Sequence, residues 1–264
     1  MGDTSPWRLI DDSGLPGALN MARDVALLEQ VSAAAAPPTV RLYGWAPPCL
    51  SLGRNQPETA ADLEFCSRHG VDVVRRPTGG RAVLHHLELT YSVTAPVGRD
   101  GLPRAVQEIY RKLCAGLVLA CRELGVEASL TPGEVNLALP GPRTAVPCFQ
   151  APAGGEVVVG RRKLIGSAMR VKSGVVLQHG AILLGWDGRL QAGAMGLLDD
   201  RELRAQVTTI EAELGRPPDR ASVALAVVQG LETELGVSLT PGALTEAELA
   251  REHELASEYR PAAK

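Results

Sequence analysis

Aromatic residues are scarce in this chain, where Phe, Trp and Tyr make up 3% of the 264 residues. Leu, Val and Ala must therefore build most of the core. No uncharged apolar run reaches the roughly 18 residues that indicate a membrane-spanning helix, and no basic region followed by an apolar stretch opens the chain. We therefore expect neither membrane association nor a secretory signal.

Cysteines are few, and their pattern excludes two classes of protein. Five are present, an odd number, and no Cys-x-x-Cys occurs. This argues against a disulfide framework and against a zinc knuckle, and the five histidines form no helical His-x-x-x-His pair. The sequence therefore predicts a reduced, cytoplasmic protein with no metal site. We expect Cys66, Cys114 and Cys121 to be small core residues, since they lie in helical segments.

A basic field is also missing. The formal net charge is −3, from 27 Lys and Arg against 30 Asp and Glu. A global attraction for nucleic acid is therefore not expected. The composition, 45% hydrophobic and 22% charged, is typical of a globular chain with one large α/β core, or one domain with an appendage.

Hydrophobic periodicity predicts alternating helices and strands. Helical spacing covers 18–34 and 103–124, and β patterns cover 39–45, 71–75, 89–95 and 175–184, with a hairpin over 156–165. From about residue 200 the pattern is helical, and Thr245 opens the last helix with a capping box. We predict an α+β fold, a mixed β-sheet flanked by helices. The expected domains are a catalytic domain over 1–200 and a helical extension over 201–264 packed on it.

Residues 127–155 show no regular period and contain five prolines. A loop of this length in a compact domain is usually functional. Cys148 lies near its end, in Val-Pro-Cys-Phe-Gln, and Lys163 follows in the predicted hairpin. An ammonium group close to a thiol favours the thiolate, which is a nucleophile able to carry an acyl group. Cys148 and Lys163 are therefore the candidate catalytic pair, although a loop cysteine with no such neighbour is inert.

Between two predicted strands lies Arg75-Arg-Pro-Thr-Gly-Gly-Arg-Ala-Val-Leu-His85. Its paired glycines allow a tight turn with exposed amides, which suit an acyl carbonyl or a phosphate, or form a simple hairpin turn. The segment is neither a P-loop nor a Rossmann fingerprint. His85 and His86 must point to opposite faces of a strand. His179, in an apolar strand, fits a hydrogen-bonded core residue as well as a site residue.

Seven segments in order resemble one known family. They are Asn20-Met-Ala-Arg-Asp-Val-Ala-Leu-Leu28, Leu52-Gly-Arg-Asn-Gln56, Arg75–His85, Glu88-Leu-Thr-Tyr-Ser92, Pro147-Cys-Phe149, Lys163-Leu-Ile-Gly-Ser-Ala168 and Gln178-His-Gly180. The chain resembles the octanoyl-carrier-protein:protein octanoyltransferases of the LipM type, within the superfamily of lipoate-protein ligases and biotin ligases. That resemblance implies a catalytic domain like the core of class II synthetases, with no cofactor.

The resemblance also implies a reaction and a site. An octanoyl group would pass from acyl carrier protein to a lysine of a lipoyl domain, typically the glycine-cleavage H protein. Cys148 would carry the thioester and Lys163 would lower the pKa of its thiol. The implied substrate-binding residues are Arg76, Thr78, Gly79, Gly80, Arg81, His85, Gly166, Ser167, Ala168, Gln178, His179 and Gly180.

An acyl slot of fixed length requires apolar walls. Val83, Ile165, Val176 and Leu177 come from strands beside the motifs, and we expect alternation to direct some of them into the slot, with Arg76 and Arg81 at its mouth. The chain departs from the family pattern at His86, where an acidic residue is common, at Met169 in place of Gln, and at Gly154-Gly155 in place of an aromatic residue. These departures bear on the shape of the pocket.

The main alternative is an ATP-dependent lipoate-protein ligase of the same fold. Such ligases resemble this chain in the Arg-Arg and His-Gly segments, but usually have a third glycine where Arg81 stands, lack the cysteine and carry a longer C-terminal domain. An amidotransferase that moves octanoyl between lipoyl domains and an inactive carrier-protein-binding module are further alternatives. Acyl transfer without ATP distinguishes a transferase from a ligase, and the absence of any transfer indicates the binding module.

Overall fold

The computed structural model describes residues 6–135 and 154–259. The strands are β1 (Trp7–Leu15), β2 (Thr39–Trp45), β3 (Cys49–Leu52), β4 (Asp72–Arg75), β5 (Val83–His85), β6 (Glu88–Pro96), β7 (Ser129–Leu130), β8 (Val157–Val159), β9 (Arg162–Lys172), β10 (Val175–Leu183) and β11 (Leu239–Pro241). The helices are α1 (Gly17–Ser32), α2 (Leu63–Arg68), α3 (Val106–Glu123), α4 (Gly188–Ala194), α5 (Arg201–Gln206), α6 (Ile210–Leu214), α7 (Arg220–Leu235) and α8 (Glu246–Ala256), with short 3₁₀ turns at Glu58–Ala60 and Ser257–Tyr259.

These strands form two sheets. The larger has the order β11-β1-β2-β6-β10-β9-β8-β7, and the smaller has the order β4-β3-β5. In the larger sheet β1 pairs in parallel with β2 and β11, and the other neighbours are antiparallel. The expected mixed sheet flanked by helices is therefore confirmed.

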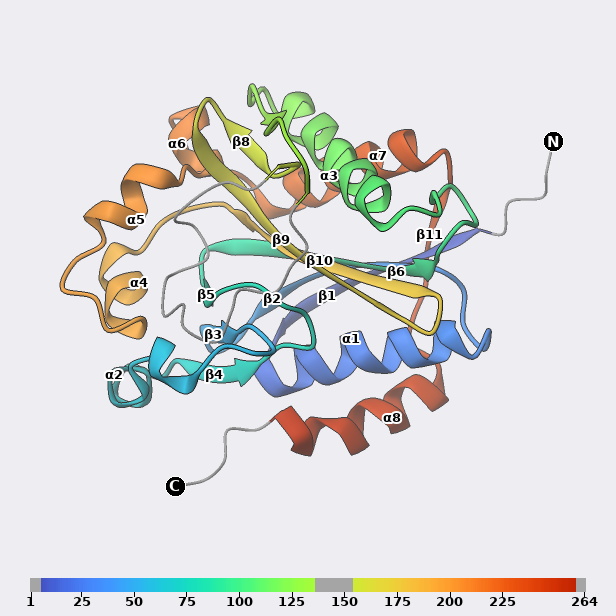
Figure 1. Cartoon of the computed structure of the whole chain (residues 1–264), viewed down its shortest axis with the longest axis horizontal. Helices are drawn as coiled ribbons and strands as arrows, with labels where there is room; N and C mark the ends of the chain where they lie inside the picture. Colours follow the sequence, from blue (N-terminus) through green and yellow to red (C-terminus); the bar gives the residue numbers. More distant parts are fainter. Residues whose placement is uncertain (1–5, 136–153, 260–264) are drawn as a thin grey trace.

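Helices cover both faces of the large sheet. In Figure 1, α1 and α8 lie on one face, and α3 and α7 lie on the other. The main core lies between the sheet and the α3–α7 pair, and it includes Leu113 and Leu117 of α3 and Val227 and Leu231 of α7. The small sheet lies beside α1, next to α2 (Figure 1). A cavity therefore forms where α1, the small sheet and the large sheet meet.

Most predicted elements are present with shifts of a few residues at their ends. Asp219 caps α7 through the backbone NH of Ser222 at 2.9 Å, and Thr245 makes the predicted capping box with Glu248. The strands β1, β3, β7 and β11 and the helix α4 were not expected, and β7 lies within 127–155, where no regular structure was predicted. β11 joins the edge of the large sheet from the C-terminal stretch, and the division of the chain near residue 200 stays a prediction.

Candidate active site

The glycine loop between β4 and β5 is held from inside by Arg76. Its guanidinium is 4% exposed and donates to the carbonyl oxygens of Gly79, at 2.7 and 3.1 Å, and of Arg81, at 2.8 Å. It also donates to the carbonyl and the hydroxyl of Ser51, at 3.0 and 3.2 Å. We expected Arg76 at the mouth of an acyl slot. Instead, its donors are directed at backbone carbonyls, so the buried guanidinium fixes the shape of the loop.

Close backbone packing explains the glycines of this loop. Gly80 has a φ of +94°, and a Cβ there would lie 2.6 Å from an Arg76 nitrogen. A Cβ on Gly53 would lie 2.0 Å from the carbonyl oxygen of Gly80. Only glycine fits both positions, so the close packing around the loop fixes its backbone conformation.

Thr78 ties the same loop to the centre of the large sheet. Its hydroxyl lies 2.6 Å from Nε2 of His179 in β10, and Nδ1 of His179 lies 3.1 Å from a carboxylate oxygen of Asp24 in α1. Asp24 also accepts from Arg41 at 2.9 Å and from Tyr43 at 2.9 Å. Because a carboxylate only accepts, Nδ1 of His179 carries the proton and Nε2 accepts from Thr78.

Burial sets the charges of this network. Burial lowers the pKa of His179 and outweighs the hydrogen bond and charge of Asp24, so the imidazole is neutral. Burial opposes ionisation of Asp24, but the hydrogen bond from His179 and the charge of Arg41 outweigh it and lower the pKa of Asp24. Asp24 and Arg41 therefore form a buried ion pair, and neutral His179 connects that pair to the glycine loop.

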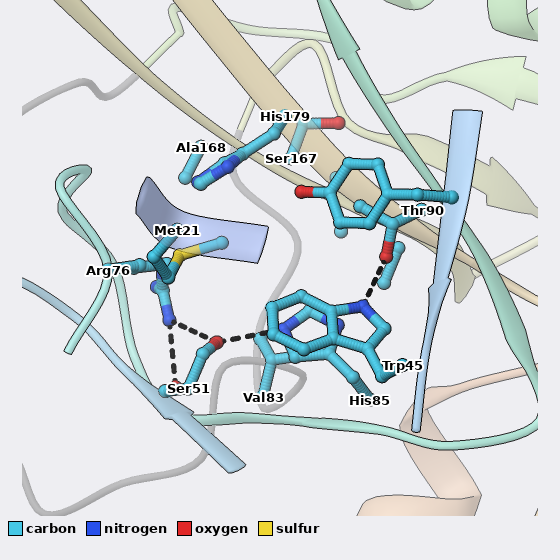
Figure 2. A pocket seen from close by; sticks show the side chains of 14 residues that line it. Met21, Trp45, Ser51, Arg76, Val83, His85, Thr90, Ser167, Ala168 and His179 are labelled. Carbon is cyan, nitrogen blue, oxygen red and sulfur yellow. Dashed lines mark hydrogen bonds between the residues drawn. The ribbon is translucent and has the colours of Figure 1, made fainter. Parts of the chain in front are cut away.

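A pocket lies beside this network and is largely apolar. It holds about 390 Å³ of empty space, part of it open to solvent. Figure 2 shows the side chains that surround it, which come from α1, β2, both sheets and the glycine-loop segment. The lining consists of Met21, Tyr43, Trp45, Ser51, Arg76, Val83, His85, Thr90, Gly166, Ser167, Ala168, His179, Gly180 and Ala181.

Of the four residues from which the walls of the acyl slot were expected, one lines the pocket. Val83 lines the pocket. Ile165 and Val176 instead pack in the main core, and Leu177 packs with α1 in a separate apolar cluster. The alternation of β9 and β10 explains Ile165 and Val176, because the pocket side of these strands carries the small residues Gly166, Ala168 and Ala181. Leu177 is on the pocket side of β10 but lies further along the strand, against α1. Small side chains leave room for a ligand, and large ones fill a core.

One end of the pocket is formed by a stacked pair. The rings of Trp45 and His85 are 4.0 Å apart and inclined by 17°. Nε2 of His85 lies 2.8 Å from the hydroxyl of Ser51, which also accepts from Arg76, so Ser51 links the two residues (Figure 2). His86 lies just after the end of β5, outside the strand, so the expectation that the two histidines point to opposite faces of a strand does not apply to it; its Nε2 approaches Asp187 at 3.9 Å.

Of the remaining predicted binding residues, some line the pocket and the others lie close to it. Gly166, Ser167, Ala168 and Gly180 line it, whereas Thr78, Gly79, Gly80 and Arg81 lie just behind it in the glycine loop. Gln178 is buried on the α3 side, where it donates to the Tyr91 hydroxyl at 2.9 Å. That hydroxyl bonds Ser167 at 2.7 Å, so Gln178 supports Ser167 from below.

Lys163 is buried at the start of β9. Its ammonium, 1% exposed, forms an ion pair with Glu156 at 2.6 Å. Glu156 precedes β8, so the hairpin that was expected from the sequence brings the two side chains together. Lys163 is not among the residues that line the pocket. Cys148 lies outside the residues that the structure describes, so its approach to Lys163 stays a prediction.

The four other cysteines are all buried and have free thiols. Burial raises the pKa of Cys66 to about 11, of Cys114 to about 12 and of Cys121 to about 12, and it raises the pKa of Cys49 well above its usual value. None of them is a thiolate near neutral pH. The expectation that Cys66, Cys114 and Cys121 are core residues is confirmed, and Cys49 belongs with them.

Sequence analysis missed several residues of this region. Asp24 lies in the middle of an apolar helix face, and a carboxyl at such a position is a signal for a buried partner. Glu88 belongs to the Glu88–Ser92 segment but was given no role. Trp45 and Tyr43, two of the rare aromatics, end a predicted strand beside the pocket.

Within residues 6–135 and 154–259, no three His, Cys, Asp or Glu side chains are grouped so that they could hold a metal ion. No helix in these ranges has the length and apolar character needed to cross a bilayer.

Comparison with known families gives a match over most of the chain. Residues 16–232 match the lipoyl protein ligase A/B catalytic domain. The octanoyltransferase LipM of Symbiobacterium thermophilum is 41% identical over 256 residues, which cover 92% of this chain and 91% of that protein. The octanoyltransferase LipM of Geobacillus kaustophilus is 41% identical over 261 residues, covering 95% and 94%.

Solved structures show the same fold at lower identity. A crystal structure of lipoate-protein ligase A bound with ATP superposes with a TM-score of 0.79 at 23% identity, covering 96% of this chain and 95% of that one. A bi-partite lipoate protein ligase of Thermoplasma acidophilum, described together with its E2 lipoyl domain, superposes with a TM-score of 0.76 at 22% identity, covering 96% and 92%. At this identity the likeness establishes the arrangement of the elements.

Proposed function

The chain belongs to the lipoyl protein ligase A/B catalytic domain family, and we propose that it is an octanoyltransferase of protein lipoylation. It moves an octanoyl group from octanoyl-acyl carrier protein to a lysine of a lipoyl-domain protein such as the glycine-cleavage H protein. A near full-length match to octanoyltransferases supports the activity. A lipoate ligase structure described with a lipoyl domain supports this class of acceptor.

The observation that carries the proposal is the apolar pocket between the glycine loop and the small residues of β9 and β10. Each methylene that leaves water for such a pocket contributes about 0.8 kcal/mol. A medium saturated chain therefore gains binding energy there. The Arg76-braced glycine loop lies beside the pocket and holds its backbone rigidly, which suits the positioning of a reacting carbonyl group.

The proposed chemistry has two transfers. The Cys148 thiolate attacks the octanoyl thioester of the carrier protein, a new C–S bond forms, and the carrier thiolate leaves. The acceptor lysine then attacks the Cys148 thioester, a C–N bond forms, and the Cys148 thiolate leaves. The high pKa values of Cys66, Cys114 and Cys121 support Cys148 as the nucleophile, because those thiols stay protonated.

An intact-mass measurement tests this function. Purified protein is mixed with octanoyl-acyl carrier protein without ATP, and then with a lipoyl domain. We expect a mass increase of one octanoyl group on the enzyme and its subsequent appearance on the lipoyl domain. Cys148→Ala should abolish both, with Cys66→Ala as the matched control that retains them. Transfer that persists in Cys148→Ala would contradict the covalent mechanism. Transfer that occurs only from free octanoic acid in the presence of ATP would show that the enzyme is a ligase.

Lys163 is proposed to stabilise the Cys148 thiolate, and its ion pair with Glu156 makes a paired test possible. An ammonium within about 4–6 Å favours an anion by one to three pKa units. Lys163→Ala should therefore raise the pH midpoint of Cys148 alkylation. Glu156→Gln removes the compensating negative charge and should lower that midpoint or leave it in place. A Lys163→Ala midpoint equal to that of the wild type contradicts this role.

We place the reaction in the cytoplasm, because thiols are kept reduced in that compartment. The ATP-dependent ligase is the second candidate, supported by the fold it shares with lipoate-protein ligase A. Omission of ATP from the mass measurement separates the two. The domain boundary proposed near residue 200 is unaffected by this choice.

A further inference from the structure

A second cavity adjoins the acyl pocket. It is a wide groove with about 1220 Å³ of open space, and it shares Trp45 and His85 with the pocket. Its other lining residues are Gly14, Gly44, His86, Leu87, Glu88, Leu184, Gly185, Glu211, Pro217, Pro218 and Arg220. The stacked rings of Trp45 and His85 therefore separate the acyl pocket from a broad opening on the surface.

Two buried polar atoms at the inner end of this groove lack hydrogen-bond partners among the described residues. They are Oε2 of Glu88 and Nδ1 of His85. The Glu88 side chain is 2% exposed, and its other oxygen accepts from the Thr90 hydroxyl and lies 3.4 Å from Nδ1 of His85 without hydrogen-bond geometry. A buried carboxyl oxygen without a partner is rare and unfavourable, so this pair of atoms has the character of a site that a ligand completes.

The charges around the groove indicate which ligand. Glu88 lies at its inner end and the exposed carboxylate of Glu211 lies further out. The one arginine in the lining, Arg220, is engaged with Asp11 at 2.7 Å. The walls at Trp45, Leu87 and the two prolines are apolar. A groove with these apolar walls, one buried carboxyl group and one exposed carboxyl group complements a long alkyl stem that ends in an ammonium group.

We propose that this groove admits the acceptor lysine of the second transfer and that Glu88 Oε2 receives its ammonium group. The proposal rests on the octanoyltransfer function and deepens it by assigning the entry path of the acceptor. The lysine approaches from the side of Trp45 and His85 that is opposite to the acyl pocket. The octanoyl chain and the lysine stem thus occupy separate cavities that meet at one partition.

Glu88 also has a chemical part in this arrangement. A lysine ammonium has no lone pair and must lose a proton before its nitrogen attacks a thioester. The Glu88 carboxylate takes this first proton at Oε2. The nitrogen lone pair then forms the C–N bond while the C–S electron pair leaves on sulfur, and the second nitrogen proton goes to that sulfur. Glu88 returns its proton to water through the open groove.

Glu88→Gln tests the proposal, because glutamine keeps the shape and the oxygen that accepts from Thr90 but loses the charge. Octanoylated enzyme is first prepared from octanoyl-acyl carrier protein and then mixed with either a lipoyl domain or hydroxylamine, which is uncharged at neutral pH. We expect Glu88→Gln to form octanoyl-enzyme at the wild-type rate. Transfer to the lipoyl domain should slow on the order of 10²-fold, with hydroxylamine cleavage unchanged.

Glu64→Gln, an exposed change on α2 far from the lining residues, is the matched control and should equal wild type in every step. Equal slowing with the lipoyl domain and hydroxylamine indicates a general distortion of the site and overturns the proposal. A normal lipoyl-domain rate in Glu88→Gln overturns it as well. Failure of the wild-type enzyme to form any octanoyl adduct is a different outcome, because it removes the proposed function itself.

Discussion

At the scale of single residues, the site depends on hydrogen bonds made far inside the protein. His179 has one partner on each ring nitrogen, Asp24 and Thr78, and these come from α1 and from the glycine loop. A neutral, singly protonated ring fits this pair, because it donates on one side and accepts on the other. The orientation of the loop is therefore set by the sheet and by α1 as well as by its own glycines.

Replacement of Thr78 by valine measures the contribution of the hydrogen bond between Thr78 and His179. Valine keeps the shape and removes the hydroxyl, so Nε2 of buried His179 is left without its donor. The free energy of unfolding should fall by about 1–3 kcal/mol, the usual penalty for an unsatisfied buried polar group. Urea denaturation at neutral pH measures this change. Octanoyl-enzyme formation should slow as well, because the loop loses its link to β10.

Thr94→Val is the matched control for this prediction. Thr94 is 1% exposed, and its hydroxyl has no hydrogen-bond partner within the part of the chain that the structure describes. Removal of an unsatisfied hydroxyl is neutral or stabilising. Equal losses in the two variants indicate that the methyl-for-hydroxyl exchange itself is harmful, which contradicts a specific role for the Thr78–His179 bond.

At the scale of elements, sequence patterns identified what local periodicity encodes. Helices α1, α3 and α7 and strands β2, β6 and β10 each carry a clear apolar repeat. Strand β1 was missed because its second half, Asp11-Asp-Ser-Gly14, contains residues that are rare in strands. It forms through parallel pairing with β2 and β11, with a register shift between Asp11 and Gly14. Such pairing is a property of the whole fold.

Element packing also explains residues that sequence patterns do not. Helices α3 and α7 cross where Gly116 faces Gly230, and a Cβ on Gly230 would lie 2.2 Å from the Gly116 carbonyl oxygen. Glycine in a helix interior is otherwise unfavourable by about 1 kcal/mol relative to alanine. The two glycines permit the close crossing that supports the sheet under the pocket. Their pairing joins positions more than a hundred residues apart, which no local pattern reveals.

Part of the candidate site could also be predicted from local sequence patterns. The glycine loop, His85, His179 and the segment Gly166–Ala168 were found because each lies in a short motif with its own chemistry. The role of Arg76 as a brace and the Glu156–Lys163 ion pair required knowledge of which backbone faces which. Which of Ile165, Val176 and Leu177 reach the pocket could not be predicted, because strand alternation gives two faces without saying which one, or which stretch of it, borders a cavity.

At the scale of the whole molecule, a buried ion pair connects β1, near the start of the described chain, to α8, near its end. Arg8 of β1 donates to both carboxylate oxygens of Glu248 in α8, at 2.5 and 2.8 Å, and both side chains are buried. Arg23 of α1 binds Glu252, one turn further along α8. Helix α8 therefore covers α1, which carries Asp24 to the site, and the C-terminal segment supports the catalytic region from outside.

Glu248→Gln should weaken the attachment of α8 to the rest of the protein, because Arg8 would stay buried without its counter-charge. Breaking such a pair typically lowers the free energy of unfolding by about 3–5 kcal/mol. Glutamine keeps the capping-box geometry of Thr245, so a decrease of this size would be due to the lost charge. Burial alone would raise the pKa of Glu248, but the hydrogen bonds from Arg8 and Thr245 and the charge of Arg8 together outweigh it and lower the pKa below the usual 4.5. A carboxyl with a lowered folded-state pKa stabilises the protein above its unfolded-state pKa and loses that contribution as pH falls through the folded-state value.

Urea denaturation across pH should therefore show a large gap in the free energy of unfolding between wild type and Glu248→Gln at pH 7, and this gap should close below pH 4.5. Glu246→Gln, exposed on the same helix, should follow wild type throughout; a gap that stays constant with pH would mean that shape, and not charge, holds α8 in place.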